Sequence, residues 1–131
     1  MAAVTALVAT AAASAAPAEP DAIRGEAIYA RCQACHALAF DRVGPRHCGL
    51  FGRRAGSVPG FAYSPAMQRS AISWNEQSLD RFLAAPMRVV PGTTMTYAGV
   101  ANRRERADLI AYLRQVDQTP ACRSSQSAGS R

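Results

Sequence analysis

Residues 30–40 read ARCQACHALAF, which places Cys32 and Cys35 three positions apart with His36 directly behind the second. Half of a zinc site, a redox-active dithiol and an attachment point for haem all begin with such a cluster. Two sulfurs at this spacing lie within one turn and can form thioethers to two vinyl groups of one porphyrin, with the next imidazole beneath the iron. Cys-x-x-Cys-His is the signature of c-type haem attachment. The stretch therefore favours a covalent haem.

The zinc and dithiol interpretations each require further features elsewhere in the sequence. A structural zinc site needs four ligands, and His47, Cys48 or Cys122 could supply the fourth. The adjacent pair Cys35 and His36 is poorly placed to point at one tetrahedral ion. A thioredoxin-type dithiol needs a preceding strand and a βαβ pattern, and neither is indicated. The remaining alternative is a binding module held together by zinc or disulfides, which would be colourless because it has no haem.

The composition indicates one globular domain. The chain has 131 residues, of which 49% are hydrophobic but only 7% aromatic. Many apolar residues are small alanines, so a bulky prosthetic group would help to fill the core. All 15 basic residues are arginine and the net charge is +6. No basic run exceeds two residues and aromatics do not alternate with them, so we expect no nucleic-acid binding.

The N-terminal segment resembles an export signal. Residues 2–18 read AAVTALVATAAASAAPA, an uncharged apolar stretch that ends in small residues. It is short and alanine-rich for a membrane-spanning helix. The basic residues usual before such a core are missing, and an uncleaved anchor is the alternative. We expect a signal peptide over 1–18 and a periplasmic protein, a location that also suits four cysteines.

Capping residues and apolar spacing predict helices separated by long loops. The predicted caps are Asp21, Ser64 (with Pro65 next), Asn75 and Asn102. Pro86 should end the third helix. The last helix carries an apolar stripe, Leu109, Tyr112, Leu113 and Val116. Residues 37–60 and 87–99 read as irregular, and the Ser-rich 123–131 as a flexible tail. The fold class is all-α.

A second axial ligand for an iron is available in VPGTTMTYAG. There Pro91 and Gly92 fix a loop that could hold the thioether of Met95 rigidly. Methionines usually fill cores, and that role suits Met67 and Met87 on short helical pieces better than Met95.

A series of seven short motifs spans the chain from about Gly25 to Leu113. In order, they are CQACH, VGP, GLFGRRAG, PGFAYS, ISW, VPGTTMTYAG and RADLIAYL. This series resembles the class I c-type cytochromes, close to mitochondrial cytochrome c and bacterial cytochrome c2. The resemblance implies the small cytochrome c fold over 19–122, with helices and long loops wrapped around one covalently bound haem c.

The resemblance also implies the iron site. Cys32 and Cys35 match the thioether positions, His36 the proximal ligand and Met95 the distal ligand. Imidazole and thioether together saturate the iron, and the methionine raises its potential. Pro45 matches the carbonyl that accepts the other ring hydrogen of the proximal histidine.

Further cofactor-binding positions follow from the same resemblance. Buried propionates need donors. The matching residues are Arg53, Tyr63, Ser64, Trp74 and Thr93. Gly25 and Tyr29 match a contact of the first helix with Leu109 and Tyr112 of the last.

Some positions depart from the family pattern. His47 stands where relatives usually have leucine near the haem, and Phe82 where mitochondrial proteins have a tyrosine. Positions that ring the haem edge with basic residues in those relatives are neutral here: Met87, Thr94, Ala101 and Asn102.

The two remaining cysteines, Cys48 and Cys122, are expected to form a disulfide. They are left over after haem attachment in a compartment where thiols oxidise, and the family fold brings the loop near the C-terminal end. A buried free Cys48 with Cys122 loose in the tail is the alternative.

The resemblance implies a single-haem electron carrier of the periplasm and the respiratory chain, monomeric and not an enzyme. Its donor would be the cytochrome bc1 complex, and its acceptor a terminal oxidase or a photosynthetic reaction centre. The competing class is a small haem peroxidase or ligand sensor in which Met95 dissociates.

Overall fold

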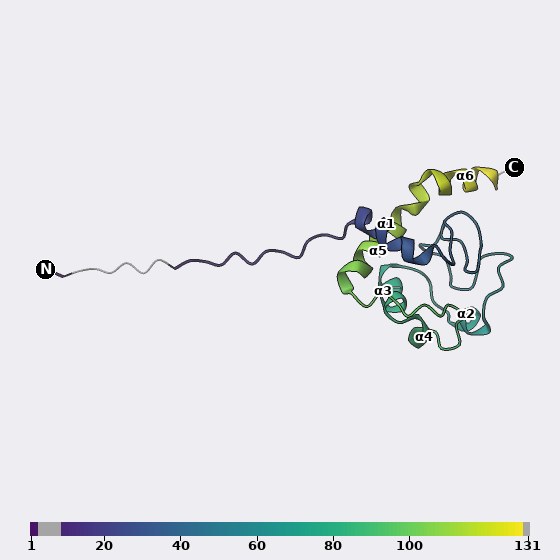
Figure 1. Ribbon diagram of the computed structural model, residues 1–131, viewed down its shortest axis with the longest axis horizontal. Coiled ribbons are helices and arrows are strands. Elements are labelled where there is room, and N and C mark those ends of the chain that lie inside the picture. The colour runs from purple at the N-terminus through teal and green to yellow at the C-terminus, as the bar shows by residue number, and fades with distance from the viewer. Residues whose placement is uncertain (3–8, 130–131) are drawn as a thin grey trace.

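The computed structural model describes residues 1–2 and 9–129, and within them the chain is helical (Figure 1). The elements are α1 (Ala22–Tyr29), η1 (Ala30–Cys32), α2 (Pro65–Arg69), α3 (Glu76–Ala84), α4 (Pro86–Val89), α5 (Arg103–Gln115), η2 (Val116–Gln118) and α6 (Pro120–Ala128). The described residues contain no strand, and an isolated antiparallel bridge joins Arg54 to Ser73. The predicted all-α class is confirmed.

The four predicted caps all accept backbone hydrogen bonds. The carboxylate of Asp21 accepts from Ile23 at 2.8 Å, and Ser64 Oγ accepts from the amide of Met67 at 3.1 Å. The side chains of Asn75 and Asn102 do the same for α3 and α5. These bonds satisfy donors that the first helical turn leaves unpaired, so each helix begins where its cap stands. Pro86 ends α3 as predicted and also occupies the first position of the one-turn helix α4.

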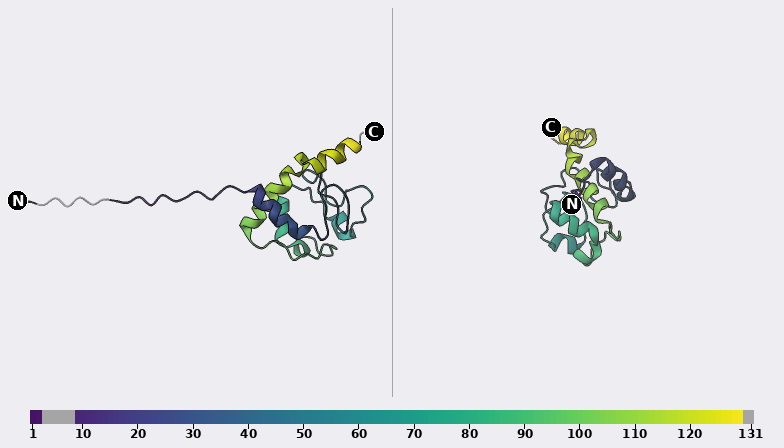
Figure 2. Two further views of the ribbon diagram at one scale, coloured as in Figure 1. Left: turned by 45° about the horizontal axis from the view of Figure 1, so that its top comes forward. Right: turned by 90° about the vertical axis from the view of Figure 1, so that its left-hand side faces the viewer.

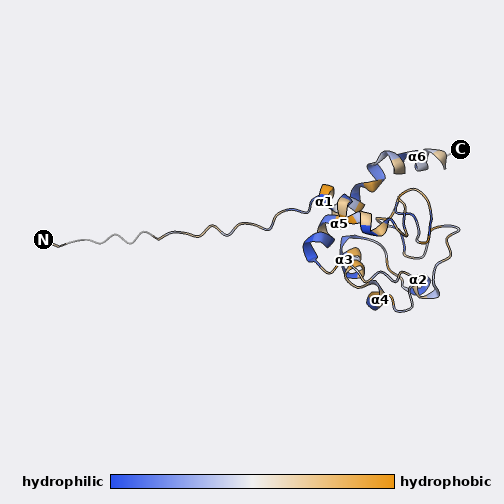
Figure 3. Ribbon diagram, viewed as in Figure 1, coloured by the Kyte–Doolittle hydropathy of each residue, from blue (hydrophilic) through white to orange (hydrophobic). Residues whose placement is uncertain are grey.

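Helices α1 and α5 cross at Gly25, as predicted. A Cβ on Gly25 would lie 2.0 Å from the carbonyl oxygen of Asp108, so only glycine permits this approach. Beside the crossing, the rings of Tyr29 and Tyr112 lie 5.3 Å apart, and Leu109 is fully buried. The first turn of α5 carries three arginines and is hydrophilic (Figure 3). The crossing forms one side of the core.

Between η1 and α2 the chain forms long loops without an α-helix, and these loops pass around the other side of the core (Figure 1). Their apolar side chains join those of the helices in one cluster. Loop members of that cluster are Cys48, Leu50 and Ala55. The loops therefore contribute to the core as much as the short helices α2 and α4 do.

The C-terminal segment differs from the predicted flexible tail over 123–131. Helix α6 covers Pro120–Ala128 and lies at one edge of the molecule in both views (Figure 2). Pro120 suits the first helical position, and Cys122 is fully buried. Hydroxyls of Ser124 and Ser127 donate back to carbonyls four residues earlier, so the serines do not oppose the helix. Residues 130–131 of that prediction lie outside the described residues.

The predicted signal peptide over 1–18 falls partly on residues 3–8, which lie outside the described residues. Residues 9–20 are extended and helix-free and lead away from the domain (Figure 1). In the described part of the chain, no helix has the length and hydropathy needed to span a membrane. Export stays a prediction.

Candidate functional site

The cysteine–histidine cluster forms a tight turn directly after α1. The amides of Cys35 and His36 both donate to the carbonyl of Cys32, at 3.1 and 2.9 Å. This turn brings the two sulfur-bearing residues and the imidazole to one wall of a cavity. Neither Cys32 nor Cys35 is in a disulfide. The cluster thus presents two thiols and one imidazole to the same space.

The zinc and dithiol interpretations lose their support at this point. No group of three or more histidine, cysteine or acidic residues that could hold a metal occurs among residues 1–2 and 9–129. Burial raises the pKa of the Cys32 thiol, whereas a redox-active dithiol depends on a lowered one. The turn follows a helix and no strand precedes it.

The ring of His36 is fixed from two sides. Its Nδ1 donates a hydrogen bond to the carbonyl of Pro45 at 2.8 Å, as predicted, because a carbonyl can only accept. A Cβ on Gly44 would lie 2.3 Å from the ring, so the loop can pass here only as glycine. The side chain is 8% exposed. Nε2 remains as the nitrogen able to bind an iron.

The electrostatic surroundings keep this ring neutral. Burial lowers the pKa of His36 below its usual 6.5 and the nearby charge of Arg53 adds to this, while the bond to Pro45 opposes them. A metal ligand must be the neutral imidazole. The site therefore presents the form of His36 that an iron requires.

All nine predicted iron-binding and cofactor-binding residues line this one cavity. They are Cys32, Cys35, His36, Arg53, Tyr63, Ser64, Trp74, Thr93 and Met95. They come from η1, the long loops, the start of α2 and the segment after α4. Met67 of α2 also lines the cavity and is 8% exposed, so position alone leaves two methionines at the site.

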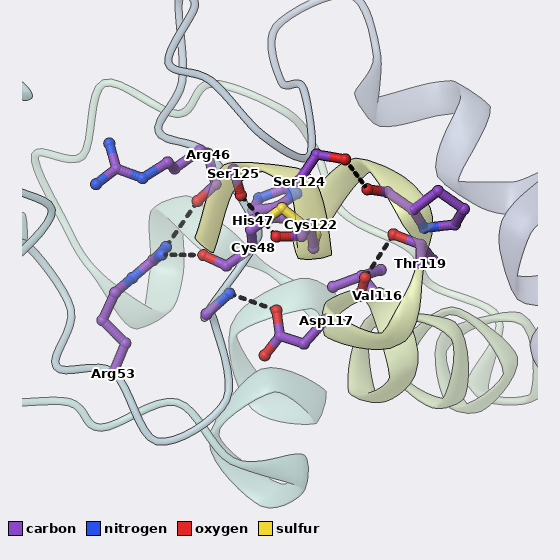
Figure 4. The surroundings of a disulfide bond; sticks show 12 residues. Arg46, His47, Cys48, Arg53, Val116, Asp117, Thr119, Cys122, Ser124 and Ser125 are labelled. Carbon is purple, nitrogen blue, oxygen red and sulfur yellow. Dashed lines mark hydrogen bonds between the residues drawn. A yellow bond between two sulfur atoms is a disulfide. The ribbon is translucent and has the colours of Figure 1, made fainter. Parts of the chain in front are cut away.

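Arg53 carries a polar atom that its own surroundings do not satisfy. Its two terminal nitrogens donate to the carbonyls of Cys48 and Arg46 at 3.2 and 2.9 Å (Figure 4). Its Nε is buried and has no partner among the described residues. Burial lowers the pKa of this guanidinium. A buried, unpaired donor on a cation that lines the cavity fits an acidic group of a bound molecule, such as a haem propionate.

Three hydroxyls add to this donor set. Tyr63, Ser64 and Thr93 each accept a backbone hydrogen bond, from Val58, Met67 and Met95 respectively. Each oxygen keeps its own proton for donation. Trp74 is buried, with its ring 5.0 Å from that of Phe82. The residues present at the cavity therefore fit a flat apolar group with acidic substituents.

The structure joins Cys48 to Cys122, the expected pair, in a disulfide with Cα atoms 5.3 Å apart (Figure 4). Beside it, the amide of Gly49 donates to the carboxylate of Asp117 at 2.6 Å. The loop behind the proximal ligand is therefore attached to the segment that follows α5.

Two cavity residues have roles that the sequence did not predict. The rings of His36 and His47 stack with centroids 4.2 Å apart, and the hydroxyl of Tyr29 lies 2.9 Å from Nδ1 of His47. Burial, with the nearby charge of Arg53, lowers the pKa of His47 well below its usual 6.5. The sequence showed that a polar residue replaces a leucine at position 47, but nothing in it indicated the partner at position 29.

A comparison with protein families matches residues 22–117 to the Cytochrome c family. The chain belongs to the cytochrome c family. It is 44% identical to cytochrome c2 of Rhodomicrobium vannielii over 96 residues, which cover 71% of this chain and 77% of the relative. It is 41% identical to cytochrome c of Euglena viridis over 99 residues, 73% of this chain and 97% of the relative.

Among solved structures, cytochrome cH from Methylobacterium extorquens superposes with a TM-score of 0.71 at 38% identity. The match covers 72% of this chain and 98% of the other. The small cytochrome c fold predicted from the motifs is thereby confirmed. The chain carries one covalently bound haem c and is a single-haem electron carrier. Helix α6 and Cys122 lie beyond the matched range 22–117.

Proposed function

We propose that the chain is a monomeric periplasmic carrier that passes single electrons from a cytochrome bc1 complex to a terminal oxidase or a photosynthetic reaction centre. The observation that supports this most is the common cavity of the nine predicted site residues, with the neutral ring of His36 fixed at its wall. The relatives named cytochrome c2 add support for a bacterial carrier. The N-terminal segment adds support for the periplasm.

In this proposal each residue of the turn has a separate task. Cys32 and Cys35 bind the cofactor through thioethers, which keeps it in place through every redox cycle. His36 would hold the iron through Nε2, and its bond to Pro45 constrains the ring orientation and raises the basicity of that nitrogen. The haem supplies an iron that changes by one electron between its ferric and ferrous states.

Met95 is the proposed second ligand. A soft thioether, together with a neutral imidazole, would favour the ferrous form of a bound haem and raise its reduction potential. The hydrogen bond from its amide to Thr93 Oγ1, at 3.2 Å, stabilises the loop that presents it. If His36 and Met95 both held the iron, no place would remain there for a substrate, and the chain would transfer electrons without being an enzyme.

The proposed hydrogen-bond donors to the haem propionates are Arg53, Tyr63, Ser64, Trp74 and Thr93. Arg53 is the strongest of these candidates because its buried Nε has no other partner. Because these donors are already in place before the cofactor binds, they would bind the charged propionates and so keep them apart from the apolar interior of the cavity.

The test is spectroscopic. The purified protein should give a reversible reduced-minus-oxidised spectrum of a low-spin haem c, unchanged by carbon monoxide or cyanide. It should accept electrons from purified bc1 complex and return them to oxidase or reaction-centre membranes. Rapid binding of either ligand by the unmodified protein would instead identify a peroxidase or sensor.

A second measurement concerns location. In cells that express the full chain, the haem-stained protein should appear in the periplasmic fraction with a shortened N-terminus. Retention in the membrane fraction at full length would support the uncleaved anchor and count against a diffusing carrier.

A further inference from the structure

His47 and Tyr29 form a polar pair directly behind the proximal residue His36. The His47 ring lies nearly parallel to that of His36, with an angle of 23° between the planes and 4.2 Å between the centroids. The Tyr29 ring meets the His47 ring edge-on, with centroids 5.6 Å apart, and the Tyr29 hydroxyl lies 2.9 Å from His47 Nδ1. Tyr29 itself is 1% exposed.

The hydrogen bond identifies the proton positions. The hydroxyl of Tyr29 has no other partner in the described part of the chain, and burial raises its pKa, so it keeps its proton. A buried hydroxyl that donates to no partner is costly, so Tyr29 donates and Nδ1 of His47 accepts. In the neutral ring the proton is then on Nε2. The stacked imidazole is thus uncharged, in one tautomer and held in one orientation.

We propose that His47, held by Tyr29, is a positioning residue that fixes the plane of the His36 ring and lowers the reduction potential of the site. This inference rests on the proposed role of His36 as the iron ligand. Two contacts already constrain the His36 ring: Pro45 accepts a hydrogen bond from one of its atoms, and Gly44 passes close beside it. A nearly parallel ring stacked on His36 adds a third constraint, on the tilt of the ring plane.

The effect on potential follows from polarity. The ferric site carries one more positive charge than the ferrous site, and polar neighbours stabilise the more charged state. A dipolar imidazole does this better than an aliphatic side chain of similar size. His47→Leu should therefore favour the ferrous form by about threefold to tenfold, which for a one-electron couple raises the midpoint by about 30–60 mV.

The test is a double-mutant cycle on the holoprotein with Tyr29→Phe, His47→Leu and the combined variant. The readouts are the midpoint potential and the spread of the haem-methyl proton NMR shifts in the ferric state, which reports the plane of the axial imidazole. Tyr29→Phe should change both. In the His47→Leu background the same change should have no further effect. Tyr112→Phe, the same change on the neighbouring ring that does not line the cavity, should alter neither readout.

The proposal is overturned if Tyr29→Phe leaves the potential and the methyl shifts unchanged, or changes them equally in both backgrounds. Because Tyr29→Phe removes one oxygen and keeps the packed ring, it gives an answer even if His47→Leu does not fold. A protein whose spectrum lacks a low-spin haem c would overturn the proposed function as well. A normal spectrum with no response to Tyr29→Phe would overturn only this inference.

Discussion

The carboxylate of Asp108 accepts a hydrogen bond from Nε of Arg24 at 3.0 Å and so joins α5 to α1 across their crossing. The same carboxylate accepts from the amide of Asp21 at 2.7 Å, and only 3% of its side chain is exposed. Arg104, one turn earlier on α5, lies 3.2 Å from it. The crossing at Gly25 is therefore secured by a charged group as well as by close packing.

This contact predicts a loss of stability in acid. Burial raises the pKa of Asp108, but the bonds from Arg24 and Asp21 and the arginine charges outweigh it and hold the pKa below its usual 3.8. The stabilisation is complete above about pH 4, the usual range of an unfolded aspartate, and is lost as the pH falls through the folded pKa. Asp108→Asn should lower the free energy of unfolding by about 1–3 kcal/mol at pH 7. In denaturant titrations the gap to the wild type should narrow below pH 4. A gap that stays constant down to pH 2 would contradict this.

The disulfide between Cys48 and Cys122 should stabilise the fold substantially. It joins residues 74 positions apart, so breaking it frees a long loop in the unfolded chain. Reduction, or the double change Cys48→Ser and Cys122→Ser, should lower the free energy of unfolding by up to about 4 kcal/mol. Guanidinium unfolding with and without a thiol reductant measures this, because thioethers resist the reductant. The double variant is the control, and with the iron kept ferrous in every sample its stability should not respond to the thiol reductant.

Replacing Ala71 with glycine should increase the stability of the fold. Ala71 is the one non-glycine residue among those described with a positive φ, at 57°. A residue with a Cβ pays about 1–2 kcal/mol to adopt a left-handed backbone conformation. Glycine avoids this cost, but it loses more conformational entropy on folding than alanine does, which offsets part of the gain. Ala71→Gly should raise the free energy of unfolding by about 0.5–1 kcal/mol in this balance. Ala111→Gly, inside α5, should have the opposite sign. Destabilisation by both would show that the backbone at position 71 is not strained.

The two cavity methionines can be distinguished by one substitution. Met95→Leu should open the iron, lower the reduction potential and allow carbon monoxide to bind, because leucine offers no ligand atom. Met67→Leu makes the same change on α2 and should leave the spectrum low-spin, with a small effect on packing. Optical titrations with carbon monoxide and redox potentiometry check both. An exchange of the two outcomes would make Met67 the ligand.

Electron transfer to a partner should depend weakly on salt. Met87 and Thr94 are exposed and neutral, the nearby Arg31 is paired with Glu105 at 2.8 Å, and Arg88 remains as an exposed charge beside them. Few unpaired charges thus remain to steer an encounter. The rate with a purified oxidase should fall little between 0.01 and 0.1 M salt, although the Debye length shortens from about 30 to about 10 Å.

The matched comparison is the double variant Met87→Lys and Thr94→Lys. It should react faster at low salt and lose that advantage as salt is added. An equally steep salt dependence in both proteins would place the steering charges elsewhere on the surface.

Much of this molecule is readable from short sequence separations. Cys32, Cys35 and His36 lie within one turn, so their common direction follows from local backbone geometry alone. Asn75 and Asn102 cap amides three residues ahead, and the structure confirms both. A capping bond or an apolar stripe joins residues so close in the chain that only one local conformation brings them together.

Other features were decided only by the tertiary structure. The stacking of His47 on His36 and the bond of His47 to Tyr29 require a helix and a loop to come together. The angle between two stacked rings cannot be predicted from the residue types. The unpaired Nε of Arg53 depends on where the carbonyls of a folded loop point. The Ser-rich end of the chain forms α6, whose first turn carries the buried Cys122 that is bonded to a residue 74 positions away. The attachment turn, the capped helices and the family could all be inferred from the amino-acid sequence. The polar surroundings of the proximal ligand were set by loop closure, since contacts between distant residues depend on the whole packed core.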